Sequence, residues 1–321
     1  MFRRLSSFPT NTGPTKSRRL HARSSRVSRR RRHTSGVPCG SIAKCYGTNN
    51  NKTCFGRLMM SGGVMEPSGD ARTALRVVNV RKAFGSLEAI KNISVDIADG
   101  EFISLLGPSG CGKSTLLMMI AGLTQASAGE LVLAGLPISG PRNDVGVVFQ
   151  SPVLLPWRTV VDNVLFPIEL LRLPRAQYRG RAMELLKMTK LEEFANALPR
   201  QLSGGMRQRA SICRALIHNP STLLMDEPFS ALDAITRDDM AVELLRIWHA
   251  NRKTVIFVTH SIREAAFLSD RVLVMGRRPA TIIDELKIDL PRPRHIGITE
   301  EESFNKYVRH LRKSIEASHA S

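Results

Sequence analysis

The sequence predicts an α/β fold in which short apolar strands end in glycine-rich or acidic loops and are followed by helices. Residues 102–106 form an apolar run of strand length, and a glycine-rich loop at residues 107–115 follows it directly. The helix expected at residues 114–123 is apolar on nearly every side, as a buried helix is. A second apolar strand, residues 221–225, ends in two adjacent acids. These strand–loop–helix units are the basis of the predicted fold class.

The composition permits one large α/β domain, or a core with a smaller subdomain. The chain has 321 residues, of which 42% are hydrophobic. No stretch reaches the roughly 18 consecutive apolar residues of a membrane-spanning helix, so we expect any membrane role to be peripheral. The cysteines are few and odd in number, which favours a reducing cytosol over a disulfide framework. They are Cys39, Cys45, Cys54, Cys111 and Cys213.

The net charge of +19 is concentrated at the N-terminus. Residues 1–65 contain 14 Lys or Arg and no acidic residue, which leaves 33 basic and 28 acidic residues, a balance of +5, for residues 66–321. The segment 1–70 is rich in Arg and Ser and has few apolar residues, so we expect it to be disordered. Three interpretations stay open: a nucleic-acid-binding arm, an organelle transit peptide, or a segment upstream of the true translation start at Met59, Met60 or Met65.

The loop after the first strand matches the pattern G-x-x-x-x-G-K-[ST]. It consists of Gly107, Pro108, Ser109, Gly110, Cys111, Gly112, Lys113, Ser114 and Thr115. Glycines let backbone N–H groups approach phosphates closely, and the following helix N-terminus adds partial positive charge. Lys113 is expected to reach the β- and γ-phosphates and the Ser114 hydroxyl to bind Mg²⁺. The loop therefore predicts nucleotide binding, although many folds with different functions share such a loop.

The acidic pair at the end of the second strand supplies the other half of the predicted site. A buried strand brings Asp226 to its tip, where the carboxylate can hold Mg²⁺ through water. Glu227 lies one residue further along, where it can act as the base that orients the attacking water.

Residues 202–208, Leu-Ser-Gly-Gly-Met-Arg-Gln, open a helix expected to run to about His218. Together with the loop and the acidic strand, this segment resembles the signature of ATP-binding cassette (ABC) proteins, a resemblance that covers about residues 75–320. It implies an α/β fold with a P-loop NTPase (RecA-like) core, an antiparallel β subdomain and an inserted α-helical subdomain. The ATPase domain is expected at 75–290, its helical subdomain at about 151–215, and a C-terminal tail helix at 291–321.

The resemblance assigns further residues one at a time. Gln150 follows a strand at 145–149 and is similar to the family's Mg²⁺-sensing glutamine, whereas His260 follows a strand at 254–259 and is similar to the histidine on the γ-phosphate. Asp233 belongs to a segment, 230–233, that resembles the loop at the dimer interface. Phe84 falls where the family stacks an aromatic ring on adenine, although a lone Phe is more often a core residue.

In this family two cassettes face each other, so the resemblance implies a homodimer or a paired homologue. Ser203, Gly204 and Gly205 are then expected to act on the nucleotide of the partner. Helical patterns at 162–171 and 176–189, separated by Pro174, indicate a helical subdomain. The resemblance implies that this subdomain receives a transmembrane permease. A solute-binding protein outside the membrane and a peripheral position on the cytoplasmic face of the inner membrane are implied as well.

Two segments narrow the resemblance to importers of the nitrate, sulfonate and taurine family. Residues 153–160 contain Leu-Pro-Trp, and residues 288–294 are similar to the tail of the same group. A stripe of apolar residues further on is expected to pack on the core: Phe304, Tyr307, Val308, Leu311 and Ile315. By resemblance this subunit does not contact the cargo, so sulfonates or taurine, nitrate, and pyrimidine precursors of thiamine stay open, with sulfonates favoured.

Two alternatives accompany this interpretation. The first is a soluble ABC-type ATPase with a regulatory or nucleic-acid-linked role, which would use the basic arm; the mildly basic remainder gives no reason to expect nucleic acid as a partner. The second concerns Cys111, which is either a thiol activated by the helix N-terminus and open to alkylation or a small, inert residue that fills the loop.

Overall fold

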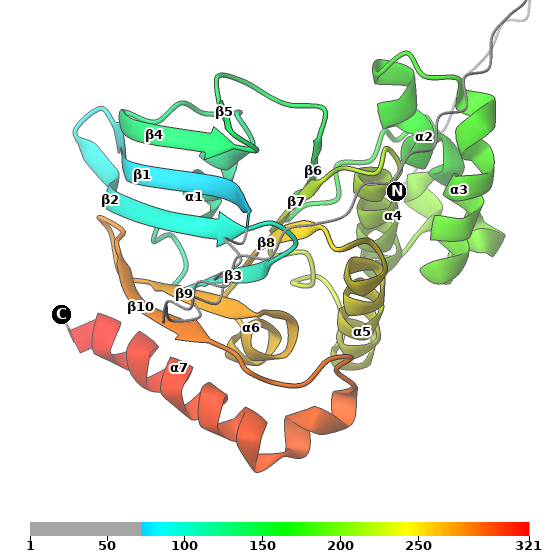
Figure 1. Ribbon diagram of the computed structural model, residues 1–321. Coiled ribbons are helices and arrows are strands. Elements are labelled where there is room, and N and C mark those ends of the chain that lie inside the picture. Colours follow the sequence, from blue (N-terminus) through cyan, green and yellow to red (C-terminus); the bar gives the residue numbers. More distant parts are fainter. Residues whose placement is uncertain (1–71, 321) are drawn as a thin grey trace, which may run out of the picture. The chain divides into compact units, whose positions relative to one another are not determined.

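Residues 72–320 are described by the computed structural model, and they form two β-sheets with helices packed around them (Figure 1). The expectations for residues 1–70 lie outside the described residues. No helix within residues 72–320 combines the length and the apolar character needed to cross a membrane.

The larger sheet has six strands in the order β10-β9-β3-β8-β7-β6. Five of them run parallel, and β10 pairs antiparallel with β9 at one edge. The strands are β3 (Phe102–Leu106), β6 (Val145–Val148), β7 (Thr222–Asp226), β8 (Thr254–Thr259), β9 (Arg271–Met275) and β10 (Ile282–Lys287). The strands predicted at 102–106, 145–149, 221–225 and 254–259 are confirmed to within one residue at each end.

Successive residues of this sheet pack into two separate hydrophobic clusters, one on each face. In β3, Phe102 and Leu106 belong to one cluster while Ile103 and Leu105 belong to the other. The same alternation runs through β7, β8 and β9. A sheet buried on both faces needs continuously apolar strands, which is why these segments lack an alternating polar pattern.

The smaller sheet is antiparallel and packs on the face of the large sheet that also carries α1 (Figure 1). Its order is β2-β1-β4-β5. The strands are β1 (Thr73–Phe84), β2 (Leu87–Ala98), β4 (Ala128–Leu133) and β5 (Leu136–Pro137). Leu75, Val77 and Ile93 point from this sheet into the cluster shared with Ile103 and Leu105.

The helices are α1 (Lys113–Ile120), α2 (Val160–Leu170), α3 (Arg175–Met188), α4 (Gly204–Leu216), α5 (Ala234–Asn251), α6 (Ile262–Leu268) and α7 (Glu302–Ala320). Short 3₁₀ turns lie at η1 (Glu192–Phe194), η2 (Pro199–Gln201) and η3 (Ile296–Glu300). α2 begins two residues before the predicted start, because the Thr159 hydroxyl caps it by accepting from the Asp162 N–H at 3.2 Å. α3 begins directly after Pro174, one residue before the predicted start at 176.

The C-terminal helix packs along α6 and β10 through the predicted stripe (Figure 1). Phe304, Val308 and Leu311 are buried, and Tyr307 and Ile315 pack partly buried against the same cluster. The helix itself starts at Glu302, so the first part of the expected 291–321 segment is a connection that contains η3.

Candidate active site

The phosphate loop connects the end of β3 to the start of α1, so the free N–H groups of the first helical turn face the loop. Two of its glycines are required by geometry. A Cβ atom on Gly107 would lie 2.6 Å from the carbonyl oxygen of Met275, and Gly112 has a φ of 123°. A side chain at either position would therefore displace or strain the loop.

Lys113 is buried and its ammonium group is held by the loop itself. The Nζ atom donates to the carbonyl oxygens of Gly107 at 2.9 Å and of Pro108 at 2.8 Å. These two bonds curl the side chain back over the loop, which places a positive charge beside the N–H groups of the first turn. The arrangement is suited to a phosphate chain, which would meet both kinds of donor.

Ser114 and Asp226 form the part of the site that suits a metal ion. The Ser114 hydroxyl donates to Oδ1 of Asp226 at 3.0 Å. Burial raises the pKa of the Asp226 carboxyl, and the charge of Glu227 acts in the same direction. A hydroxyl and a carboxylate beside phosphates are the oxygen ligands that Mg²⁺ takes, and a dication would offset the cost of the buried charge. The residues present therefore fit a magnesium ion.

Glu227 lies at the meeting point of three strands. Its Oε2 atom accepts from Nε2 of Gln150 at 3.2 Å and lies 3.1 Å from Nδ1 of His260. Its backbone has a φ of 43°, in the left-handed region that a side chain rarely occupies. The two adjacent acids have different partners: Asp226 accepts from Ser114, whereas Glu227 contacts Gln150 and His260.

The order of the strands explains why these residues meet. β3, β8, β7 and β6 are successive neighbours and parallel, so their carboxyl ends lie along one edge of the sheet. Ligands of open α/β sheets bind at this edge. The phosphate loop follows β3, His260 follows β8, Glu227 follows β7, and Gln150 follows β6. The structure thus brings together the predicted residues of one ATP site, although their chemical roles stay a prediction.

Comparison with known proteins matches residues 90–230 to the family model described as ABC transporter. An ABC transporter ATP-binding protein of Methanocaldococcus jannaschii is 46% identical over 246 residues, which are 75% of this chain and 92% of the relative. The taurine import ATP-binding protein of Rhizobium johnstonii is 48% identical over 207 residues, 64% of this chain and 79% of that protein. This chain belongs to the ABC transporter family.

A solved structure supports the same assignment. It is a dimeric ATP-binding cassette in a post-hydrolysis state with ADP and Pi, 35% identical to this chain, with a TM-score of 0.61. It matches 68% of this chain and 100% of its own length. The predicted fold class is confirmed: this ABC protein is a P-loop ATPase cassette with a mixed α/β structure.

The signature segment of this ABC cassette lies at the start of α4. Ser203 caps the helix by accepting from the Met206 N–H at 3.2 Å, and Gly204 and Gly205 form its first turn. No hydrogen bond within residues 72–320 joins these three residues to the phosphate loop of the same chain. Their expected action on a partner's nucleotide stays a prediction.

Asp233 lies at the start of α5, and Phe84 lies at the end of β1. Asp233 caps α5 by accepting from the Thr236 N–H at 3.0 Å, a bond that also lowers the pKa of its carboxyl. Phe84 is 51% exposed at the end of β1, with Nζ of Lys82 4.7 Å from the ring centroid. The interpretation of Phe84 as a core residue is therefore wrong, and one face of the ring is already covered by a cation.

Cys111 lies beneath the phosphate loop rather than on its surface. Its side chain is 2% exposed and packs in the cluster between the two sheets. A Cβ atom at Gly107 would lie 3.4 Å from its Sγ atom, which shows how closely the thiol fills the loop. This burial favours the second alternative, an inert space-filling residue, and argues against a thiol open to alkylation.

One residue that touches the phosphate loop was missed by the sequence analysis. Arg278, between β9 and β10, donates from Nη2 to the carbonyl oxygen of Gly110 at 2.6 Å. The two residues are 168 positions apart. An Arg in a surface turn carries no local signal that would have pointed to the loop.

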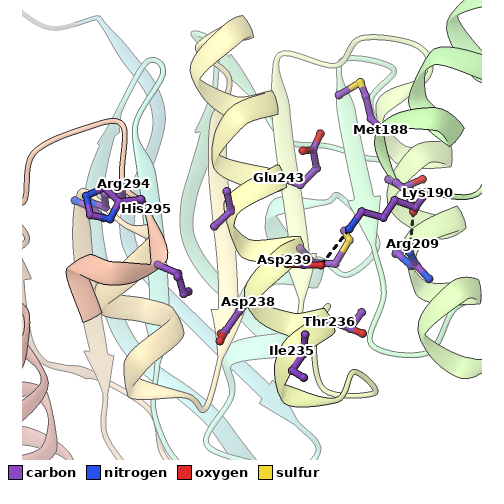
Figure 2. Close-up of a pocket in the computed structure, with 14 residues that line it drawn as sticks. Met188, Lys190, Arg209, Ile235, Thr236, Asp238, Asp239, Glu243, Arg294 and His295 are labelled. Atoms are coloured by element: carbon purple, nitrogen blue, oxygen red, sulfur yellow. Dashed lines mark hydrogen bonds and ion pairs between the residues drawn. The ribbon is translucent and has the colours of Figure 1, made fainter. Parts of the chain in front are cut away.

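A separate cleft of about 780 Å³ lies away from this ABC ATP site (Figure 2). Its walls come from the end of α3, from α4 and α5, and from residues 294–296. Lys190 reaches across it to Asp239 at 3.2 Å, and Arg209 donates to the carbonyl oxygen of Thr189. None of the predicted nucleotide-binding residues lines this cleft, so the size of the cleft does not make it the ATP site.

Proposed function

We propose that this ABC cassette binds and hydrolyses ATP to drive uptake of a small sulfonate-type solute through a separate permease. The observation that carries the proposal is the convergence of Ser114, Asp226, Gln150, Glu227 and His260 around the phosphate loop. The name of the Rhizobium relative, a taurine import ATP-binding protein, supports an aminosulfonate among the cargo classes.

One group of these residues binds the nucleotide, and another group acts in hydrolysis. Lys113 and the first turn of α1 hold the β- and γ-phosphates, which carry most of the negative charge. Ser114 and Asp226, with the amide oxygen of Gln150, would hold Mg²⁺, and the ion would supply positive charge that neutralises the phosphates.

Glu227 acts on the attacking water. Its carboxylate accepts the proton of the water and aligns the oxygen with the γ-phosphorus atom. Gln150 and His260 contact the same carboxylate oxygen and orient it, and His260 also donates to the γ-phosphate. The exposed imidazole can turn between these two partners, since its side chain is 57% exposed.

A second cassette completes each site in this proposal. Ser203, Gly204 and Gly205 present a capped helix N-terminus and close the nucleotide of the partner, with Phe84 stacked on adenine. The dimeric arrangement of the solved relative supports a homodimer or a paired homologue. ATP then favours the closed pair by contacts that only the closed pair offers, and hydrolysis removes them.

The assembly places this chain beside the membrane without entering it. The cassette lies on the cytoplasmic side of the inner membrane. Its helical subdomain, proposed at about residues 151–215, contacts the transmembrane permease subunits. The exposed Trp157 and Leu170 offer apolar surface for that contact. A solute-binding protein delivers the cargo, which this subunit does not touch. The alternative of a soluble ATPase that uses the basic arm on nucleic acid finds no support among the relatives.

The test is ATPase activity of the assembled importer in liposomes with its solute-binding protein. The panel contains taurine, alkanesulfonates, nitrate and pyrimidines. Stimulation by taurine or alkanesulfonates supports both the coupling and the cargo class, whereas stimulation by another class corrects the cargo alone. If the chain assembles with no permease and no cargo changes its rate of ATP hydrolysis, the proposed importer function would be contradicted.

A further inference from the structure

The loop that carries His260 is anchored by Glu264, a carboxylate with a 12% exposed side chain that none of the family motifs assigned. Oε2 of Glu264 accepts a 2.6 Å hydrogen bond from the hydroxyl of Thr259. The oxygen of that hydroxyl accepts from the N–H of Ser261 at 3.0 Å. The Thr259 hydroxyl therefore links Ser261 to the Glu264 carboxylate, and these two bonds hold the backbone on both sides of His260.

The same carboxylate faces a cation from a different helix. Oε1 of Glu264, in α6, lies 3.6 Å from Nε of Arg237, in α5. Nη2 of Arg237 donates to the carbonyl oxygen of Leu232 at 3.0 Å, one residue before the α5 cap Asp233. Arg237 therefore connects the loop at residues 230–233 with the carboxylate under His260.

These contacts close into a ring around the site. The Ser230 hydroxyl donates to the carbonyl oxygen of Glu227 at 2.9 Å, and the side chain of Glu227 contacts His260. The contacts lead from Glu227 to the 230–233 loop and from that loop to Arg237. Arg237 contacts Glu264, which is bonded to Thr259, the residue before His260. A shift in the 230–233 loop can therefore reach His260 by two routes, through Glu227 and through Glu264.

The Arg237–Glu264 contact is the link of this ring whose length can change. At 3.6 Å it is an ion pair, and the buried Nε–H of Arg237 has no hydrogen-bond partner within the described residues. A cavity of about 250 Å³ borders both side chains, which leaves room beside the contact for its length to change. Burial raises the pKa of Glu264, which the hydrogen bond from Thr259 and the charge of Arg237 oppose.

We propose that Glu264 is a positioning residue, held by Arg237, that orients His260 according to the position of the 230–233 loop. This inference rests on the proposed function, because it assumes that His260 contacts the γ-phosphate. Movement of the 230–233 loop shortens or lengthens the Arg237–Glu264 contact, and Glu264 passes the change to the Thr259–Ser261 segment. Glu264, Arg237 and Thr259 do not themselves contact ATP in the proposed site.

The test compares steady-state ATPase parameters of the full chain with variants that break one link each. Glu264→Gln keeps an acceptor for Thr259 but removes the charge that faces Arg237. Thr259→Val keeps the volume but removes the hydroxyl, and Arg237→Lys keeps the charge but changes the geometry. We expect each to lower kcat on the order of tenfold, with the KM for ATP within about twofold of wild type, because misplacement of one catalytic group affects the reaction more than binding.

The matched control is Glu243→Gln, which breaks the Glu243–Arg246 ion pair on the same helix α5 at 2.8 Å. It should leave both parameters unchanged. Circular dichroism and thermal unfolding of each variant separate loss of fold from loss of position. Wild-type kcat in both Glu264→Gln and Thr259→Val would overturn the inference while leaving the ATPase assignment intact, whereas a wild-type chain without ATPase activity would count against the proposed function itself.

A second arm asks whether Glu264 acts through His260. Glu264→Gln is combined with His260→Ala, and single-turnover hydrolysis of labelled ATP is followed over hours. We expect no further loss in the double variant, since the residue to be positioned is gone. An additional tenfold loss in the His260→Ala background would show that Glu264 acts independently of His260 and would overturn the inference.

Discussion

The hydroxyl of Ser114 donates a hydrogen bond of 3.0 Å to Oδ1 of Asp226 and so joins the start of α1 to the end of β7 across 112 positions of sequence. The carboxyl is buried, which raises its pKa, and this single hydrogen bond offsets the burial only in part. The ionised Asp226 therefore lowers the stability of the folded protein at the position where Mg²⁺ is proposed to bind.

Asp226→Asn should raise the melting temperature of the nucleotide-free protein at neutral pH while it abolishes Mg²⁺-dependent hydrolysis. A folded pKa above the unfolded value means that the stabilising contribution of Asp226 is complete below the unfolded pKa and is lost as pH rises through the folded pKa. The gain from Asn should accordingly shrink between pH 7.5 and pH 4.5. Thermal scans of both proteins across this range test the sign, and a gain independent of pH would contradict it.

Glu227→Gln should bind ATP with near-normal affinity but hydrolyse it about 10²- to 10⁴-fold more slowly, because the amide cannot accept the proton of the water. The amide keeps an oxygen for the contact with Gln150, so the local structure should persist. Fluorescent-nucleotide binding and phosphate release measure the two steps separately. Near-normal turnover would remove Glu227 from the role of base.

Alkylating reagents should spare both cysteines of the folded cassette. Cys111 is 2% exposed, so a reagent cannot reach its sulfur. Burial raises the pKa of the Cys213 thiol to about 12, so that thiol stays protonated at neutral pH. Peptide mass spectrometry after treatment of the native protein checks this, with the unfolded protein as the positive control. Activity that falls in proportion to Cys111 modification would restore the reactive-thiol alternative.

Arg278→Met should raise the KM for ATP about fivefold with little change in kcat, the effect of one lost hydrogen bond of about 1 kcal/mol. Its guanidinium holds the carbonyl of Gly110, which has a φ of 75° in the phosphate loop. Arg278→Lys, which keeps a donor, should recover part of the loss. An unchanged KM in Arg278→Met would show that the loop holds its shape without this contact.

Lys190→Met should cost less than about 1 kcal/mol of unfolding free energy, although Lys190 bridges the cleft of Figure 2. Both partners of its ion pair with Asp239 are largely exposed, and exposed pairs contribute little. Phe102→Ala should cost about 3–5 kcal/mol, since Phe102 is buried against Trp248 and Phe257. Urea unfolding of both variants measures the contrast, which would fail if the two losses were similar.

The sequence by itself determined the local parts of this protein. The phosphate loop was predictable because a strand, the glycines and a helix start lie within a few consecutive residues. The stripe on α7 was predictable because helical periodicity places Phe304, Val308 and Leu311 on one face. The strands were recognised from short apolar runs, since burial on both faces requires such composition.

Only the tertiary structure decided which of these parts meet. The strand order β10-β9-β3-β8-β7-β6 does not follow the chain, and this order brings Gln150, Glu227 and His260 together. The tertiary packing also leaves Phe84 exposed and buries Cys111. The same packing brings Arg237 to Glu264 and Arg278 to Gly110. Propensity, capping and periodicity act over one or two turns of chain, whereas these contacts depend on how whole layers pack, which no short stretch of sequence encodes.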